Sequence, residues 1–268
     1  MNVSFTILLT LHQRDDIEDN FERLIQSIYT NTLLPNNILI LVDGPISSNF
    51  KLNIENQKKI KKFDVYYHHI NIGLANILNI GLKKIHTPWA IRVDGDDICL
   101  PHRFKKTIEC IHSEISIVGG YIKEIDENKV TRIKKVPIQY QNIKSYLKYR
   151  NPFNHPTVAF RVDHVLSVGG YPNLYLKEDY GLWVKMISKG YQCINIPEIL
   201  VETSFNKASY QRRSGINFLK SDISLAIMQY NLKNINKLEF FFILVLRTIT
   251  ILSPSFLKIL IYQFLRRI

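Results

Sequence analysis

Short apolar runs alternate with segments of helical spacing through roughly the first hundred residues. The apolar runs end in polar turns, and the helical segments place their apolar side chains on one face. Uninterrupted apolar strands separated by helices indicate a parallel sheet covered on both faces. We therefore expect a doubly wound α/β architecture. Strands are expected at residues 3–11, 38–42, 64–68 and 89–93, and helices at 17–29 and 74–85.

Both kinds of pattern continue as far as residue 230. Pro101 favours the start of a helix and precedes helical spacing at 103–112. Residues 115–137 are rich in β-forming side chains and contain a charged hairpin candidate at 126–129. Further strands are expected at 158–161 and 192–205, and further helices at 178–190 and 216–230.

Acidic residues close two of the predicted strands. Asp43 ends the second, and the fourth ends in Asp94-Gly95-Asp96-Asp97. In an open parallel sheet, ligands bind where the carboxyl ends of the strands converge. Three carboxylates within four residues repel one another, and a divalent cation such as Mg²⁺ or Mn²⁺ removes that repulsion. The alternative is a solvated acidic turn.

Taken in order, these motifs resemble the family 2 glycosyltransferases, which have the GT-A fold and use nucleotide-sugar donors. The resemblance spans residues 3 to about 205 and is greatest to bacterial members that build capsule, exopolysaccharide or lipopolysaccharide. It implies a metal-dependent, inverting transfer from a UDP-sugar to a saccharide or lipid-linked saccharide acceptor. The matching pieces are residues 5–11, Leu41 to Gly44, Asn71 to Leu74 with Asn79, Arg92 to Asp97, Pro101 with Arg103, and Glu178 to Trp183.

The resemblance assigns the donor site to the two acidic strand ends. Asp43 matches the residue that binds the nucleotide base or ribose, although the family usually has two acids where this chain has one. Asp94 matches the acid near the ribose and the metal, and Asp96 matches the ligand of Mn²⁺ or Mg²⁺. Asp97 either supports these acids or begins the next helix.

Asn71, Gly73 and Arg103 are further donor-side positions that the resemblance implies. Asn71 and Gly73 match a loop beside the nucleotide sugar, and Arg103 belongs to the matched segment after the acidic turn. An alternative remains open for Asn71, because an asparagine directly before a helix commonly caps it.

The pair Glu178-Asp179 matches the position of the catalytic base. An inverting transfer needs one carboxylate to take the proton of the acceptor hydroxyl as that oxygen attacks the anomeric carbon. We expect Asp179 to be this base, with Glu178 as its neighbour or as a ligand of the acceptor. The alternative is that both acids only stabilise the first turn of a helix through its dipole.

Other polar and aromatic side chains have two open interpretations. His155, in a stretch fixed by two prolines, contacts the acceptor or diphosphate, or belongs to a structural turn. Arg212 and Arg213 close over the diphosphate, because Arg forks suit phosphate oxygens, or lie on a solvated surface. Trp89 and Trp183 are expected in the core more than as platforms for a sugar.

The C-terminal segment differs in character from the rest. Residues 240–252 are almost wholly apolar, and Pro254 separates them from a second amphipathic piece at 256–267. Because Arg247 and Pro254 interrupt the apolar stretch, we expect an interfacial membrane anchor and not a spanning helix. Packing on the catalytic domain and a homodimer interface are the alternatives. Residues 237–268 carry five positive charges, which suit an anionic membrane surface, and one negative charge at Glu239. The positive residues are Lys237, Arg247, Lys258, Arg266 and Arg267.

The domain boundaries follow from these patterns. A GT-A catalytic domain is expected at 1–205, with a nucleotide-sugar half at about 1–113 and an acceptor half at about 114–205. A helical extension is expected at 206–268. The short apolar N-terminus lacks a basic region, and three scattered cysteines indicate reduced thiols. We therefore expect a cytoplasmic protein, peripheral on the inner face of the membrane.

Net charge leaves two competing functions to consider. The chain carries 35 Lys and Arg against 23 Asp and Glu, a formal charge of +12, which favours an anionic partner. A nucleic-acid-binding protein would interleave basic and aromatic residues on one surface, and no such motif is visible, so no nucleic-acid partner is expected. A phosphotransferase of the haloacid dehalogenase type would place a nucleophilic Asp on the first strand, which this chain lacks.

Overall fold

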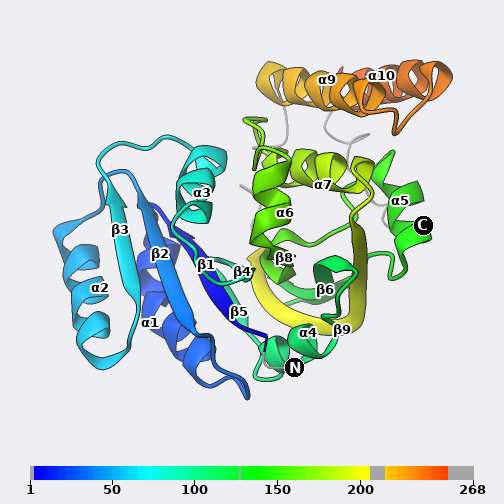
Figure 1. Ribbon diagram of the computed structural model, residues 1–268. Helices are drawn as coiled ribbons and strands as arrows, with labels where there is room; N and C mark the ends of the chain where they lie inside the picture. Colours follow the sequence, from blue (N-terminus) through cyan, green and yellow to red (C-terminus); the bar gives the residue numbers. More distant parts are fainter. Residues whose placement is uncertain (1–2, 127, 206–214, 253–268) are drawn as a thin grey trace.

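The first half of the protein is a parallel α/β unit. The computed structural model describes residues 3–126, 128–205 and 215–252 (Figure 1). Four strands are parallel, as the apolar runs predict, and they lie in the order β3-β2-β1-β4. They are β1 (Phe5–Leu11), β2 (Asn37–Asp43), β3 (Asp64–His68) and β4 (Trp89–Asp94), and the helices between them are α1 (Asp15–Tyr29), α2 (Ser48–Ile60) and α3 (Leu74–Leu82).

The central strand β1 is buried on both faces. Ile7 and Leu9 join the core cluster formed with α1 and α2, whereas Leu8 packs in the cluster that includes α3. Successive side chains of a strand point to opposite faces of the sheet. An uninterrupted apolar run is therefore what a strand between two helical layers requires.

The second half of the sheet mixes strand directions, so that the sheet as a whole is mostly but not wholly parallel, as the resemblance to the GT-A fold implies. The order continues β8-β6-β9-β5, with β8 antiparallel to both β4 and β6, and β5 antiparallel to β9. The new strands are β5 (Asp97–Cys99), β6 (Ile115–Asp126), β7 (Thr131–Lys134), β8 (Ala159–Arg161) and β9 (Gln192–Phe205), and the helices α4 (Arg103–Glu109), α5 (Tyr140–Leu147), α6 (Val162–Ser167) and α7 (Glu178–Ser188).

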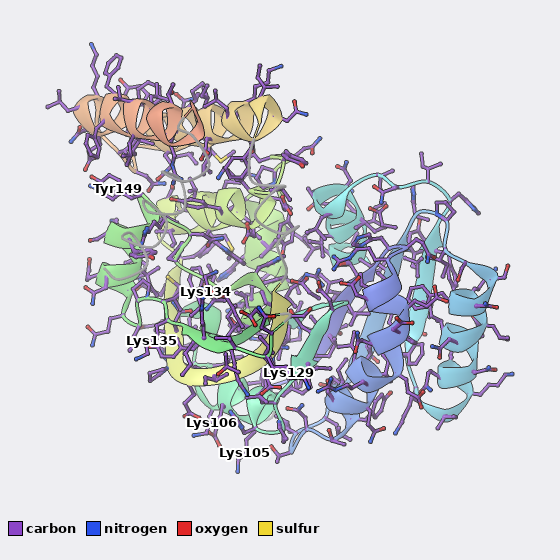
Figure 2. The ribbon with its side chains drawn as sticks, turned by 180° about the vertical axis from the view of Figure 1, so that it is seen from behind. Lys105, Lys106, Lys129, Lys134, Lys135 and Tyr149 are labelled. Atoms are coloured by element: carbon purple, nitrogen blue, oxygen red, sulfur yellow. The ribbon has the colours of Figure 1, made fainter. Side chains whose placement is uncertain are left out.

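The curl of the sheet brings distant segments to the acidic turn. β9 is long and strongly bent in Figure 1, and its pairing with β6 contains register shifts, a feature that bends strands. Its last residues pair with β5, so that Thr203 lies opposite Asp97. The expected charged hairpin is confirmed, because β6 and β7 pair as antiparallel neighbours. Lys129 and Lys134 of this hairpin are labelled in Figure 2, which views the molecule from the opposite side.

Two helices form a separate layer over α7. They are α9 (Ile216–Asn231) and α10 (Lys237–Leu252), joined by a short turn (Figure 1). Asn236 and Glu239 cap α10 reciprocally, since each main-chain amide donates to the other's side chain, at 2.8 and 2.9 Å. None of the helices in the described part of the chain is both long enough and apolar enough to cross a membrane. The second amphipathic piece, 256–267, lies outside the described residues.

Candidate active site

The acidic turn sits at the carboxyl end of β4. Asp94 is the last residue of that strand, and Asp97 is the first residue of β5. The buried guanidinium of Arg92 forms an ion pair with Asp94, and Arg14 Nη2 lies 3.0 Å from Asp96 Oδ2. Both metal-site candidates are therefore partly buried carboxylates, Asp94 paired with an arginine of its own strand and Asp96 with Arg14, which follows β1. The alternative that Asp97 begins a helix is wrong.

A glycine is required inside this turn by close packing. A Cβ at Gly95 would lie 3.0 Å from Leu11 Cδ2 and 3.1 Å from the carbonyl oxygen of Thr10. The turn thus packs directly against the end of β1.

Negative charge accumulates in the turn, as the sequence predicts. Burial raises the pKa of Asp96, and the charge of Asp94 raises it further. The same two causes raise the pKa of Asp97 well above its usual range, and Asp97 Oδ1 is buried with no hydrogen-bond partner. A divalent cation beside these carboxylates would relieve the repulsion, so the residues present fit Mg²⁺ or Mn²⁺.

The protein alone does not complete a metal centre here. Within residues 3–126, 128–205 and 215–252, no three His, Cys, Asp or Glu side chains are grouped to hold a metal. Mg²⁺ is commonly held by one or two carboxylates together with substrate phosphates and water. The arrangement therefore fits a metal that arrives with a diphosphate.

The second acidic strand end organises the loop before α3. Asp43 accepts hydrogen bonds from the amides of Ile72 and Gly73, at 2.8 and 3.0 Å. Asn71 Nδ2 donates to the carbonyl oxygen of Asp43 at 3.2 Å. A Cβ at Gly44, where φ is +95°, would meet the amide nitrogen of Asn71 at 2.9 Å. The predicted donor-side residues therefore lie together. The capping alternative for Asn71 is wrong, because Gly73 is the N-cap residue of α3.

Arg103 does not line this site. Its side chain is completely buried. Its guanidinium donates to Cys99 Sγ at 3.0 Å, to the carbonyl oxygen of Arg92 at 2.5 Å, and to the carbonyl oxygen of Pro156. The prediction of direct donor contact is corrected on this point, since Arg103 joins β4 to the segment after His155 from inside the core.

Glu178 and Asp179, the predicted general base and its neighbour, are the first two residues of α7. Asp179 Oδ2 accepts a hydrogen bond of 2.6 Å from Asn151 Nδ2, and Oδ1 accepts one of 2.7 Å from the amide of Tyr180. Burial, followed by the charge of Asp179, raises the pKa of Glu178 to about 7. The charge of Asp94 contributes to the same shift. The two acidic sites, far apart in sequence, are therefore close enough for their charges to interact.

His155 lies between these two sites. Its ring nitrogen Nε2 is 3.1 Å from the Tyr171 hydroxyl, and the charges of Asp179 and Arg92 both act on it. Burial lowers the pKa of His155 to about 4, so its imidazole is neutral at physiological pH. It begins a short 3₁₀ turn, η1 (His155–Thr157). Trp183 packs near it and is fully buried, which confirms it as a core residue.

Several site residues were missed in the sequence. Arg14 follows the end of β1, where a polar run after a strand was the available signal. Tyr171 has no such signal, because Asn79 positions it from α3 through paired hydrogen bonds of 2.8 and 2.9 Å. Arg212 and Arg213 lie outside the described residues.

Comparisons with known proteins show the family of the chain. A family model described as Glycosyl transferase family 2 matches residues 6–168. The chain belongs to this family. Among its family 2 relatives, the amylovoran biosynthesis glycosyltransferase AmsE of Erwinia amylovora is 32% identical, covering 97% of this chain and 98% of AmsE. A UDP-Gal:alpha-D-GlcNAc-diphosphoundecaprenol beta-1,3-galactosyltransferase of Escherichia coli is 33% identical, covering 97% of this chain and 95% of the relative.

Solved structures show the same fold. S. aureus TarS residues 1–349 in complex with UDP-GlcNAc superposes with a TM-score of 0.68 at 14% identity, over 92% of this chain and 73% of that one. A mannosyltransferase from Pyrobaculum calidifontis, with GDP-Man and Mn²⁺, has a TM-score of 0.63 at 13% identity, over 90% and 67%. The family 2 chain described here is thus a mixed α/β, GT-A type glycosyltransferase with its sheet flanked by helices.

Proposed function

We propose that this glycosyltransferase moves a sugar from a UDP-sugar to a saccharide linked through diphosphate to a lipid, with inversion at the anomeric carbon. One observation supports the proposal: the acidic turn at Asp94–Asp96 lies close enough to the Glu178–Asp179 pair for the charge of Asp94 to act on Glu178. The reaction needs a diphosphate site and a separate base on opposite sides of one sugar. We assign the diphosphate site to Asp94 and Asp96 and the base to Asp179.

The donor is assigned to the first half of the chain. Asp96 and Asp94 would hold Mn²⁺ or Mg²⁺, which stabilises negative charge on a leaving diphosphate when it is bound. The carboxylate of Asp43 binds the main chain of Ile72 and Gly73. We assign it the task of shaping a nucleoside-side loop, and the loop from Asn71 to Gly73 the task of contacting the nucleotide.

The acceptor is assigned to the second half. Asp179 takes the proton of the attacking hydroxyl, because Asn151 and the amide of Tyr180 hold its two oxygens in place. Glu178, with a pKa near 7, lies beside it as an acceptor ligand. Neutral His155 can accept or donate one hydrogen bond to a sugar hydroxyl.

The relatives support the class of substrate. The E. coli protein is named for UDP-Gal and an undecaprenyl-diphosphate-linked GlcNAc, and AmsE for the synthesis of amylovoran. Each aligns with nearly the whole of this chain. We therefore assign the chain to the assembly of a bacterial surface polysaccharide on a lipid carrier. Its family also decides against the phosphotransferase hypothesis.

A lipid-linked acceptor places the enzyme at a membrane surface, and α10 offers a face for it. Leu238, Phe241, Phe242 and Val245 are 81%, 54%, 59% and 57% exposed and follow helical spacing along one stripe. Such a face lies in the interface of a bilayer. Arg247 does not add to the positive charge of this face, because it turns inward to Asp222.

The test is an assay of the full-length protein with Mn²⁺, a panel of UDP-sugars and a GlcNAc-diphospholipid acceptor. Transfer from one UDP-sugar, with UDP released only when acceptor is present, is the expected result. NMR of the product should show an anomeric configuration opposite to that of the donor. Retention of configuration contradicts the base mechanism, and release of inorganic phosphate without transfer contradicts the whole proposal.

A further inference from the structure

A buried ion cluster joins the C-terminal helix pair to the residue before the catalytic acids. Lys177 is the N-cap residue of α7 and directly precedes Glu178. Its Nζ lies 3.0 Å from Asp222 Oδ1 of α9, and the two side chains are 8% and 2% exposed. Arg247 of α10 approaches the same oxygen, with its Nε at 3.6 Å. Three segments therefore meet at one carboxylate.

Burial of this cluster costs free energy. Taking charged groups out of water costs several kcal/mol per ion in real proteins, and their attraction often only offsets that cost. Burial lowers the pKa of Lys177 against the opposing charge of Asp222, and Asp222 Oδ2 has no hydrogen-bond partner. Apolar side chains of similar volume would fill the site as well. The cluster is thus better explained by geometry that it fixes than by stability.

The backbone at Lys177 needs such fixing. The preceding residue, Leu176, has φ of +55°, a left-handed conformation that is uncommon for a residue with a branched side chain. Lys177 then supplies the carbonyl oxygen that accepts the first helical hydrogen bond, 2.8 Å from the amide of Gly181. The direction of the first turn of α7, which carries Glu178 and Asp179, is set at this residue.

The same helix pair also holds the partner of Asp179. Arg247 Nη2 donates to the carbonyl oxygen of Tyr149 at 2.6 Å, and Gln229 Nε2 donates to that of Lys148 at 3.2 Å. These carbonyls lie just before Asn151, whose amide binds Asp179. Figure 2 shows Tyr149 directly beneath the layer of α9 and α10. Helices α9 and α10 therefore contact both chain segments that meet at Asp179: the start of α7 through Lys177, and the residues just before Asn151.

We propose that Asp222 is a positioning residue for sugar transfer, acting through Lys177 and Arg247 to hold Asp179 and Asn151 in register. The inference rests on the proposed role of Asp179 as the base. Donor binding belongs to the other half of the molecule and does not pass through the cluster. Loss of Asp222 should therefore lower kcat and leave the KM for the UDP-sugar unchanged.

The experiment compares Asp222→Asn with the wild type in the full-length protein, using the UDP-sugar and acceptor that the panel assay identifies. Displacement of a reacting group by about 1 Å costs on the order of 10²-fold in rate, so we expect kcat to fall by about 10- to 100-fold. Binding of UDP with Mn²⁺, measured by calorimetry, should not change. Asp222→Glu, which keeps the carboxylate, should restore part of kcat. Asp163→Asn, at a surface ion pair, is the matched control and should leave kcat unchanged.

Two further variants separate positioning from folding. Lys177→Met/Asp222→Leu removes both buried charges of the Lys177–Asp222 pair together and leaves Arg247 its hydrogen bond to the Tyr149 carbonyl, so it should fold and still show the kcat loss. Arg247→Gln removes the contacts of Arg247 with Asp222 and Tyr149 but keeps the Lys177–Asp222 pair, and it should show a smaller loss of kcat. A normal kcat in the double variant overturns the proposal, as does a fall in UDP affinity as large as the fall in kcat.

Asp179→Asn, assayed in parallel, distinguishes this inference from the mechanism beneath it. If Asp179→Asn loses activity while the Asp222 variants keep it, the positioning role is wrong and the proposed function stands. If Asp179→Asn keeps full activity, the base assignment fails, and the role of Asp222 fails with it.

Discussion

The two halves of the molecule hold their acidic residues by different means. In the first half, the carboxylate of Asp43 is held by main-chain amides next to its own strand, and Asp94 pairs with Arg92 two residues before it. In the second half, Asp179 depends on the side chain of Asn151, and its helix is anchored through Lys177 to α9. The proposed donor site is built on the sheet itself, whereas the proposed base depends on packing between separate helices.

This difference predicts how each half fails when it is changed. A change in the first half should reach the binding of the nucleotide sugar, because strand ends and the α3 loop form that site. A change in the second half should reach kcat, because it moves or removes the proton acceptor while the donor site stays intact. Kinetics that separate kcat from KM therefore test the comparison directly.

Removal of the metal should have the largest effect. Excess chelator is expected to abolish transfer, and Mn²⁺ or Mg²⁺ should restore it, because the charge of a leaving diphosphate would otherwise add to that of Asp94 and Asp96. Asp96→Ala should lose affinity for UDP with Mn²⁺, measured by calorimetry, while its circular dichroism spectrum is unchanged. Full turnover in excess chelator would rule out a catalytic metal.

Replacement of the base should follow in size. Asp179→Asn is expected to lower kcat by about 10²–10⁴-fold, the usual contribution of general-base catalysis. Its affinity for UDP with Mn²⁺ should equal that of the wild type, since its side chain contacts Asn151 and not the α3 loop. If Asp179→Asn weakens UDP binding as much as it slows transfer, the division of labour between the two halves is wrong.

The sequence was informative where structure is local. The apolar runs of the first half predict β1 to β4 in their order, because a strand buried on both faces must be apolar throughout. Helix α2 was missed because only Phe50 and Ile54 of its residues are buried, which leaves almost no periodicity. β5 has three residues and is recognisable only from its pairing with β9.

The candidate site divides in the same way. The acids at the strand ends were predicted from their position, and the pair at the start of α7 from the family resemblance. Their partners were not, because Arg14 and Asp96 are 82 residues apart, and Asn79 and Tyr171 are 92 apart. Arg103 was misassigned because the family resemblance places the segment after the acidic turn on the donor side, whereas packing directs this guanidinium to main-chain carbonyls.

Substitution of the exposed apolar face of α10 should have a smaller effect than replacement of the base. Phe241→Ser/Phe242→Ser is expected to reduce binding to vesicles of anionic phospholipid by at least about 10-fold, because burying one such side chain contributes about 1.5–3 kcal/mol. Transfer to a water-soluble acceptor analogue should be unaffected, since neither residue reaches the cluster at Asp222. Unchanged sedimentation with vesicles, together with dimer formation that the substitution abolishes, would favour a homodimer interface instead.

The smallest effect should come from Glu178 and appear as a dependence on pH. Burial and Asp179 raise its pKa to about 7, so Glu178 gains a proton as the pH falls through neutrality. A negative charge on Glu178 favours proton uptake by its neighbour. kcat should therefore be highest above pH 8, about twofold lower at pH 7, and lower still at pH 6. This is the direction expected when a base needs an ionised partner. Glu178→Gln should abolish this acid limb and have a lower, flatter profile.

The same raised pKa of Glu178 makes the stability of the fold depend on pH. Because the folded state binds this proton more tightly than the unfolded chain, the stability that the proton contributes is present at low pH and lost as the pH rises through 7. The Tm of Glu178→Gln should accordingly exceed that of the wild type at pH 8, and the difference should shrink toward pH 4. A wild-type profile without a limb near pH 7, or one that Glu178→Gln preserves, would move the titration to another residue and leave Asp179 to act without help from its neighbour.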